Sequence, residues 1–136
     1  MYKDGTITEV HTLNGYVGTF TIGPDNKFYG IWQSSPRRGS IKLIEIHLNK
    51  EMDPRVLGVG SKNSKNNDVK CDKQGNVYVF WKPNIIEVYT PQNETYLITS
   101  GIVQGHMAIS NSEPQHLYVR GFKTDTRVPA MERIDL

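Results

Sequence analysis

Short apolar stretches alternate with polar turns along the whole chain, and this pattern predicts strands. The clearest example is Asp72-Lys-Gln-Gly-Asn-Val-Tyr-Val-Phe-Trp81, a polar turn followed by β-branched and aromatic residues. Gly75-Asn76 suits the turn, because both residues tolerate a positive φ at low cost. No window of a dozen residues keeps apolar side chains at helical spacing, and twelve Gly and seven Pro interrupt the chain. The sequence therefore predicts an all-β fold.

The pattern predicts about twelve short antiparallel strands joined by turns. We expect them at residues 6–12, 17–22, 27–32, 41–47, 56–60, 68–71, 76–81, 85–89, 96–99, 107–110, 116–120 and 130–135.

The unit of turn and strand occurs three times and can be aligned on three tyrosines. Tyr29 and Tyr78 are 49 residues apart, and Tyr78 and Tyr118 are 40 residues apart. A period of about 40 to 50 residues is typical of β-propeller blades. One further strand precedes each of these three units of turn and strand. When it is included, the repeat units are about 6–48, 56–90 and 96–136, and each has enough strands for one four-stranded blade.

A later strand of each unit carries a glutamate: Glu45, Glu87 and Glu132. We expect the three glutamates at one shared strand position, most simply an outward-facing polar one.

Three blades are too few to close a ring, because propellers need about four to eight. The strand expected at 6–12 has no preceding blade, and the last unit has no following outer strand. Two copies could therefore assemble head to tail into a six-bladed ring, each 6–12 strand pairing onto the other copy's last blade. Alternatively, the strands form a self-closed sandwich or barrel. We favour three propeller-like four-stranded blades that close a ring through oligomerisation.

The bulk composition fits one folded domain over residues 1–136. Hydrophobic residues make up 37% and charged residues 22% of the chain, and the net charge of +2 does not indicate nucleic acid. The single cysteine, Cys71, excludes an internal disulfide, and we expect a small buried side chain there, not a nucleophile. No apolar run approaches the roughly 20 residues of a membrane helix, and no signal peptide is evident, so we expect synthesis in a cytoplasm and no membrane insertion.

No catalytic or metal-binding motif is evident, so we predict a non-enzymatic protein without a cofactor. The four histidines, His11, His47, His106 and His116, lack metal-ligand spacing with a nearby carboxylate. A hydrolase alternative would use Asp25, Asp72 or Glu113 as its acids.

A candidate ligand site follows from the propeller interpretation, in which the starts of the inner strands ring one mouth of the central channel. Tyr16, Asn66, Asn67, Gln104 and His106 are expected there. Glycines at these starts allow a close ligand approach, and the polar side chains provide directional hydrogen bonds. Alternatively, the glycines serve turns and His106 caps a strand.

Two tryptophans complete the candidate site. Trp32 and Trp81 end the tyrosine-containing strands of the first two units, where they either pack between blades or stack on sugars or bases. Lys82 follows Trp81 directly, an arrangement of cation and ring that suits a sugar-phosphate polymer. The predicted ligand-binding set is therefore Tyr16, Trp32, Asn67, Trp81, Gln104 and His106.

These motifs resemble known propellers over roughly residues 15 to 136. Asp-x-x-Gly-Asn-Val-Tyr-Val with a later Ile-x-Glu-Val strand resembles the blades of several β-propeller families. Gly15-Tyr-Val-Gly-Thr-Phe-Thr-Ile22, followed by Asn26-Lys-Phe-Tyr-Gly-Ile-Trp32, resembles receptor-binding tail proteins of phages that infect Gram-positive bacteria, and helveticin-type bacteriocins. In those proteins a Gly-His-Gly-Thr-type stretch precedes an inner strand. Here the first unit has Tyr16-Val17 in place of the His-Gly of that stretch, whereas the third unit retains its Gly-His as Gly105-His106.

The resemblance implies adhesion to a cell-surface glycan or a wall glycopolymer such as teichoic acid, in the tail of a virion. Its expected partners are that polymer, further copies of the chain or other virion proteins, and not nucleic acid. The alternative is a structural or protein-interaction module whose strand edges pair with a partner and which has no small ligand.

Overall fold

The computed structural model describes residues 5–7, 14–34, 40–48, 53–60 and 68–136, and this part of the chain forms eleven strands and no helix. The first sheet consists of β1 (Tyr16–Ile22), β2 (Lys27–Gln33), β3 (Lys42–His47) and β4 (Arg55–Val59). The second consists of β5 (Asp68–Cys71), β6 (Val77–Lys82), β7 (Ile85–Tyr89) and β8 (Thr95–Thr99). The third consists of β9 (Ile102–Ile109), β10 (His116–Lys123) and β11 (Pro129–Asp135).

The all-β prediction is confirmed, and neighbouring strands pair antiparallel within each sheet in chain order. Residues 5–7 are not in a strand, and the rest of the strand expected at 6–12 lies outside the described residues. The largest difference in length concerns β9, which begins at Ile102 instead of at 107. A bulge opposite Arg120–Phe122 lets β9 continue past Gln104 and Gly105, where the sequence suggested a turn.

The sheets are displaced by one strand from the sequence repeat units. β4 pairs with β3, and β8 pairs with β7, so each joins the unit that precedes it in the chain. The third sheet accordingly has three strands among the described residues.

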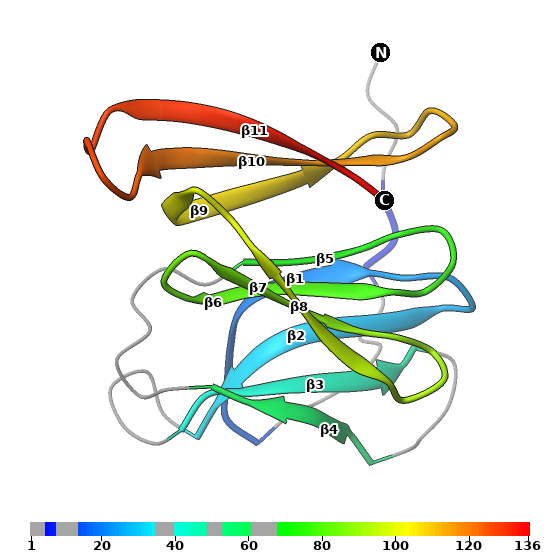
Figure 1. Ribbon diagram of the computed structural model, residues 1–136. Helices are drawn as coiled ribbons and strands as arrows, with labels where there is room; N and C mark the ends of the chain where they lie inside the picture. The colour runs from blue at the N-terminus through cyan, green and yellow to red at the C-terminus, as the bar shows by residue number, and fades with distance from the viewer. Residues whose placement is uncertain (1–4, 8–13, 35–39, 49–52, 61–67) are drawn as a thin grey trace.

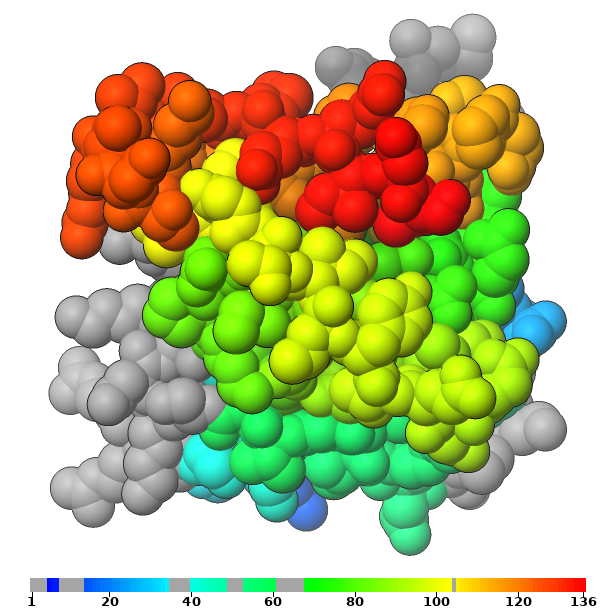
Figure 2. All heavy atoms as spheres, viewed as in Figure 1, coloured from blue at the N-terminus to red at the C-terminus, as the bar shows by residue number. Residues whose placement is uncertain are grey.

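The three sheets lie face to face, with the second sheet in the middle (Figure 1). Figure 2 shows the third sheet, in orange and red, at one end of this stack. Each sheet has a leading face, turned toward the next sheet along the chain, and a trailing face, turned the other way. One core lies between the first and second sheets and a second core between the second and third. The middle strand β6 is therefore buried on both faces.

The aligned tyrosines occupy equivalent places on the leading faces. Tyr29 points into the first core and Tyr78 into the second, and their side chains are 4% and 1% exposed. Tyr118 alternates with Leu117 and Val119, which face the second sheet, so it lies on the leading face of the third sheet. The repeat inferred from the sequence is thus a repeat in space.

The three glutamates are not equivalent, contrary to expectation. Glu87 pairs with Val79 and Glu132 with Val119, both on trailing faces, whereas Glu45 pairs with Tyr29 on a leading face. The outward-facing interpretation is also wrong for Glu87, which is 6% exposed. The sequences around the three glutamates are similar, but the register of Glu45 against its neighbouring strand differs by one residue from that of Glu87 and Glu132. A shift of one residue turns a side chain to the other face of the sheet.

Strands β1, β5 and β9 form the inner edges of the three sheets. They make the most extensive contacts between sheets, β1 with β5 and β5 with β9. Asp68 stabilises the contact between β5 and β9, because its carboxylate accepts a hydrogen bond of 2.6 Å from the backbone N–H of Met107. The inner edges thus come together on one side of the stack.

Candidate functional site

A groove opens where the three inner strands end, and we call it the axial groove. Its volume is about 530 Å³. Ile22, Cys71 and Ile109, the last residues of β1, β5 and β9, contribute to its wall. The rest of the wall is formed by Gly23, Pro24, Lys70, Asp72, Lys73, Ala108, Asn111 and Gln115. Because each sheet supplies part of this wall, the groove exists only when the sheets are stacked.

Asp72 organises the turn at the centre of this groove. One carboxylate oxygen accepts hydrogen bonds from the backbone N–H groups of Gln74 and Asn76, at 3.0 and 2.9 Å. The other accepts from the Asn76 amide at 2.9 Å and from the Tyr78 hydroxyl at 2.8 Å. Burial and the bond to Asp72 raise the pKa of Tyr78, so its hydroxyl remains a donor. Asp72 is thereby committed to the turn.

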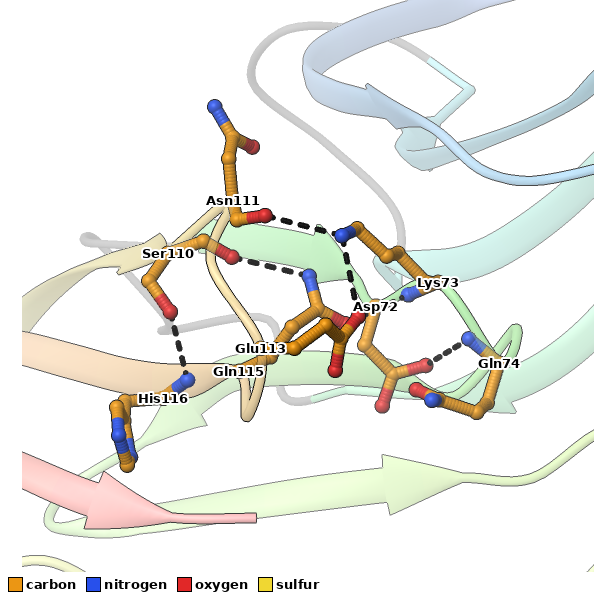
Figure 3. A network of polar contacts seen from close by, with 8 residues as sticks. All are labelled: Asp72, Lys73, Gln74, Ser110, Asn111, Glu113, Gln115 and His116. Atoms are coloured by element: carbon orange, nitrogen blue, oxygen red, sulfur yellow. Dashed lines mark hydrogen bonds and ion pairs between the residues drawn. The ribbon is translucent and has the colours of Figure 1, made fainter.

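The loop from Ser110 to His116 connects the third sheet to this turn (Figure 3). The buried Gln115 side chain accepts a hydrogen bond from the backbone N–H of Lys73 at 3.0 Å and donates one to the Ser110 carbonyl, also at 3.0 Å. The Lys73 ammonium donates to the Asn111 carbonyl at 2.9 Å and pairs with Glu113 at 3.1 Å. These contacts fix the position of Lys73 on the groove wall.

The groove presents cationic and amide groups. Lys70 pairs with Asp68 at 3.3 Å, and its side chain is 31% exposed, while that of Lys73 is 51% exposed. In Figure 3 the Asn111 amide points away from the network. Burial, followed by the charge of Asp72, raises the pKa of the Cys71 thiol to about 12. The thiol is therefore neutral at physiological pH, and the groove can offer an anion ammonium and amide donors.

A second cavity, which we call the lateral cleft, lies between the first two sheets. Its volume is about 240 Å³, and its wall includes Tyr29, Glu45, Arg55, Tyr89 and Glu94. Glu45 pairs with Arg55 at 3.6 Å, and burial followed by the nearby Glu45 raises the pKa of Tyr29. The lateral cleft is smaller than the roughly 300 to 1,000 Å³ of typical ligand sites, a range that the axial groove meets. The axial groove is therefore the better candidate.

Of the predicted ligand-binding residues that the structure describes, Trp81 lies between the first two sheets and His106 on the outermost face of the third, so these two do not share a site. Tyr16 is half exposed at the start of β1, and the Trp32 indole N–H donates to the Asn14 carbonyl at 2.7 Å. Trp81 is 2% exposed inside the first core, so it packs between sheets and offers no stacking surface.

Four residues had been expected at the mouth in the last two units. His106 lies within β9, opposite Arg120, and its exposed side chain points to the leading face of the third sheet. The predicted mouth position is wrong for His106, because β9 starts four residues before it. Asn66, Asn67 and the side chain of Gln104 lie outside the described residues.

The axial groove lies at the opposite ends of the inner strands from the predicted mouth. Sequence reasoning missed Lys70, Lys73, Asn111 and Gln115 as site residues. The available signal was the recurrence of polar turns after each inner strand, since residues 23–26, 72–76 and 110–115 follow β1, β5 and β9.

Among residues 5–7, 14–34, 40–48, 53–60 and 68–136, no group of three or more His, Cys, Asp or Glu side chains is placed to hold a metal ion. The same part of the chain has no helix with the length and hydropathy of a membrane span. No protein-family model, no curated protein and no solved structure matches the chain.

Proposed function

We propose that this chain is a non-enzymatic recognition module that binds an anionic cell-surface glycan, such as a phosphate-containing wall polymer, in the axial groove. The observation that carries the proposal is the position of Lys70 and Lys73 on the wall of a 530 Å³ groove that all three sheets line. Two ammonium groups and the Asn111 amide suit a ligand that carries both phosphate and hydroxyl groups. The resemblance to phage tail receptor-binding proteins supports the same ligand class and a virion as its setting.

The proposal includes a propeller-like arrangement of the sheets as blades. Three facts support it: the equivalent tyrosines, the antiparallel order within each sheet, and the inner position of β1, β5 and β9. In that arrangement the axial groove lies beside the propeller axis, where the inner strands converge.

The contacts of the candidate acids favour binding over hydrolysis. Asp72 accepts four hydrogen bonds within its own turn, and Glu113 pairs with Lys73. Asp25 is exposed at a turn where its φ is 60°. Each acid thus has a role in a turn or loop, and a catalytic pair needs two carboxyl groups that face one substrate.

The test is binding of purified poly(glycerol phosphate) teichoic acid, with phosphate-free dextran as the comparison polymer. We expect the teichoic acid to bind, and the variant Lys70→Gln/Lys73→Gln to bind at least tenfold more weakly. Lys123→Gln is the matched control, because Lys123 is exposed at the end of β10 and does not line the groove. Failure of the teichoic acid to bind, or equal binding by the double variant, would show that the proposal is wrong.

A second candidate function is a structural or protein-interaction module. It is favoured by exposed apolar side chains on the outermost faces of the stack, including Phe20, Ile22 and Met131 at 58%, 54% and 69% exposure. Loss of teichoic acid binding with retained self-association would support this alternative.

A further inference from the structure

The two outermost faces of the stack carry residues at positions equivalent to those buried inside it. On leading faces, Tyr29 and Ile31 of the first sheet and Tyr78 and Phe80 of the second are each less than 5% exposed. The equivalent residues of the third sheet are Tyr118, half-buried, and Arg120, exposed. They lie beside Met131 and Arg133 on the leading face, which no described sheet covers.

The trailing face of the first sheet shows the complementary pattern. Trp81 of the second sheet is buried against the first sheet, and the equivalent residue of the first sheet is Trp32, which is half-buried. Beside it, the Phe20 ring stacks on Phe28 with 5.1 Å between centroids, yet Phe20 remains 58% exposed. On β3 the same face carries Ile44 and Ile46, which are less than 5% exposed, and Lys42, whose ammonium lies 5.6 Å from the Trp32 ring centroid. The exposed apolar part of this face is therefore on β1, around Phe20 and Ile22.

A pair of equivalent glycines shows what fits on the trailing face. Gly105 of β9 lies directly against the Phe80 ring, because a Cβ built there would be 2.7 Å from a Phe80 ring carbon. Gly18 holds the same place in β1, next to the bulge that both strands contain. Among the described residues, the nearest heavy atom to the Cβ position of Gly18 is a Tyr16 ring carbon at 3.9 Å. No described side chain therefore fills at Gly18 the site that Phe80 fills at Gly105.

We propose that a second copy of this chain fills these places, with the leading face of its third sheet packed on the trailing face of the first sheet. A twofold axis repeats the contact, so two copies close one ring of six sheets and leave neither face uncovered. By equivalence with Phe80 over Gly105, Arg120 of one copy lies over Gly18 of the other.

The residues at this contact are chemically matched. A guanidinium group stacks favourably on aromatic rings, and the trailing face offers those of Phe20 and Phe28. The Trp32 ring already lies 5.6 Å from the Lys42 ammonium. The exposed thioether of Met131 suits the same rings. Arg120 and Arg133 make this contact more polar than the two cores within the chain, so we expect a dimer that dissociates on dilution.

The inference does not depend on glycan binding. In the closed ring the axial grooves of both copies surround one axis, so a polymer would meet two equivalent sites. Binding per groove remains a property of one copy, because each groove is lined from a single chain.

The first experiment measures mass by sedimentation equilibrium over a range of concentrations. We expect a species of twice 15.5 kDa that dissociates on dilution. Phe20→Asp blocks the first-sheet face and Met131→Asp the third-sheet face, and both side chains are exposed, so the fold should remain intact. Each variant alone should be a monomer with an unchanged circular dichroism spectrum. Leu97→Asp is the control, because Leu97 is 61% exposed on the second sheet, away from both faces, and this variant should remain dimeric.

Mixing the two blocked variants tests the head-to-tail geometry. The third sheet of Phe20→Asp and the first sheet of Met131→Asp are both intact, so the equimolar mixture should regain a heterodimer through one contact. The proposal would be overturned by any of four outcomes. The wild type could be a monomer at all concentrations, the dimer could survive either substitution, the mixture could stay monomeric, or the masses could grow beyond the dimer. Teichoic acid binding is measured separately on the monomeric Phe20→Asp variant. Binding by this monomer would support the functional proposal whether or not the wild-type chain dimerises.

Discussion

At the scale of single residues, Asp72 shows how one carboxylate connects a turn to a core. Its four hydrogen bonds join the backbone of the turn to the Tyr78 hydroxyl, and Tyr78 is buried between the second and third sheets. A substitution here would leave several donors without a partner, and each such loss in a buried place costs about 1–3 kcal/mol. The counterparts of Asp72 in the other units are Gly23 and Ser112, which explains why the second unit has the clearest sequence pattern.

The half-buried thiol of Cys71 should react slowly. With a pKa of about 12, only on the order of one thiol in 10⁴ is ionised at pH 8. We therefore expect iodoacetamide to alkylate the folded chain at least about a hundredfold more slowly than the chain unfolded in urea. The rate in the folded state should still be rising with pH at pH 10. Equal rates in the folded and unfolded states would contradict the neutral, half-buried thiol.

Glu87 should make stability depend on pH. Burial opposes its ionisation, but hydrogen bonds from Lys82, Tyr89 and Trp81 outweigh burial and lower its pKa. A lowered folded-state pKa means that the stabilisation is complete above the pKa of the unfolded chain and is lost as pH falls through the folded value. Glu87→Gln should therefore lower the free energy of unfolding by about 1–3 kcal/mol at pH 7.

The measurement is urea denaturation of both proteins between pH 7 and pH 3. The difference between wild type and Glu87→Gln should shrink toward low pH. Glu94→Gln is a suitable control, because Glu94 is exposed in the turn before β8, and it should show little difference at any pH. A Glu87→Gln effect that is constant with pH would argue against an ionised Glu87 as its source.

At the scale of elements, alternation and turn residues were sufficient to predict most strands. Residues 68–71 and 85–89 were predicted with the bounds of β5 and β7. Local pattern could not predict the bulge in β9, because Gln104-Gly105 has the composition of a turn and only pairing with β10 keeps the strand continuous. The one-residue register difference at Glu45 was likewise hidden, since pairing partners are set across strands.

The close approach of β9 to β6 can be tested at Gly105. A methyl group there would be 2.7 Å from Phe80 and 3.0 Å from Val119, so Gly105→Ala should lower the free energy of unfolding by about 1–3 kcal/mol. The cost should be smaller in a Phe80→Leu background, which a double-mutant cycle would measure. Gly18→Ala is the matched control at the equivalent position, where no described side chain fills this site. Measured at low protein concentration, it should change stability by less than about 0.5 kcal/mol. Equal effects at the two glycines would contradict the packing described here.

At the scale of the whole molecule, the stacking of the sheets decides where a site can form. The sequence period indicated three related units, and Tyr29, Tyr78 and Tyr118 occupy equivalent places. The period does not specify which ends of the inner strands enclose a groove. Lys73 and Gln115 are 42 residues apart in sequence, and only the packing of the third sheet on the second brings them together. For that reason the axial groove could not be predicted from the order of residues.

The stacking also predicts how stability is distributed. β6 pairs with strands on both sides, and five of its six residues are buried because a core covers each face of its sheet. β2 and β10 are also central in their sheets, but each has one outermost face. Opening β6 must disrupt both cores, so its amide exchange should require nearly the full free energy of unfolding.

Hydrogen–deuterium exchange at low protein concentration measures this distribution directly. We expect the slowest amides in β6, intermediate rates in β2 and β10, and the fastest strand amides in the edge strands β4, β8 and β11. If two copies close a ring, raising the concentration should slow exchange in β2 and β10 and leave the rank of β6 unchanged. Slower exchange in β10 than in β6 at low concentration would mean that the third sheet does not depend on the second for its stability. The chain would then be several independent sheets and not a stack held together by its middle member.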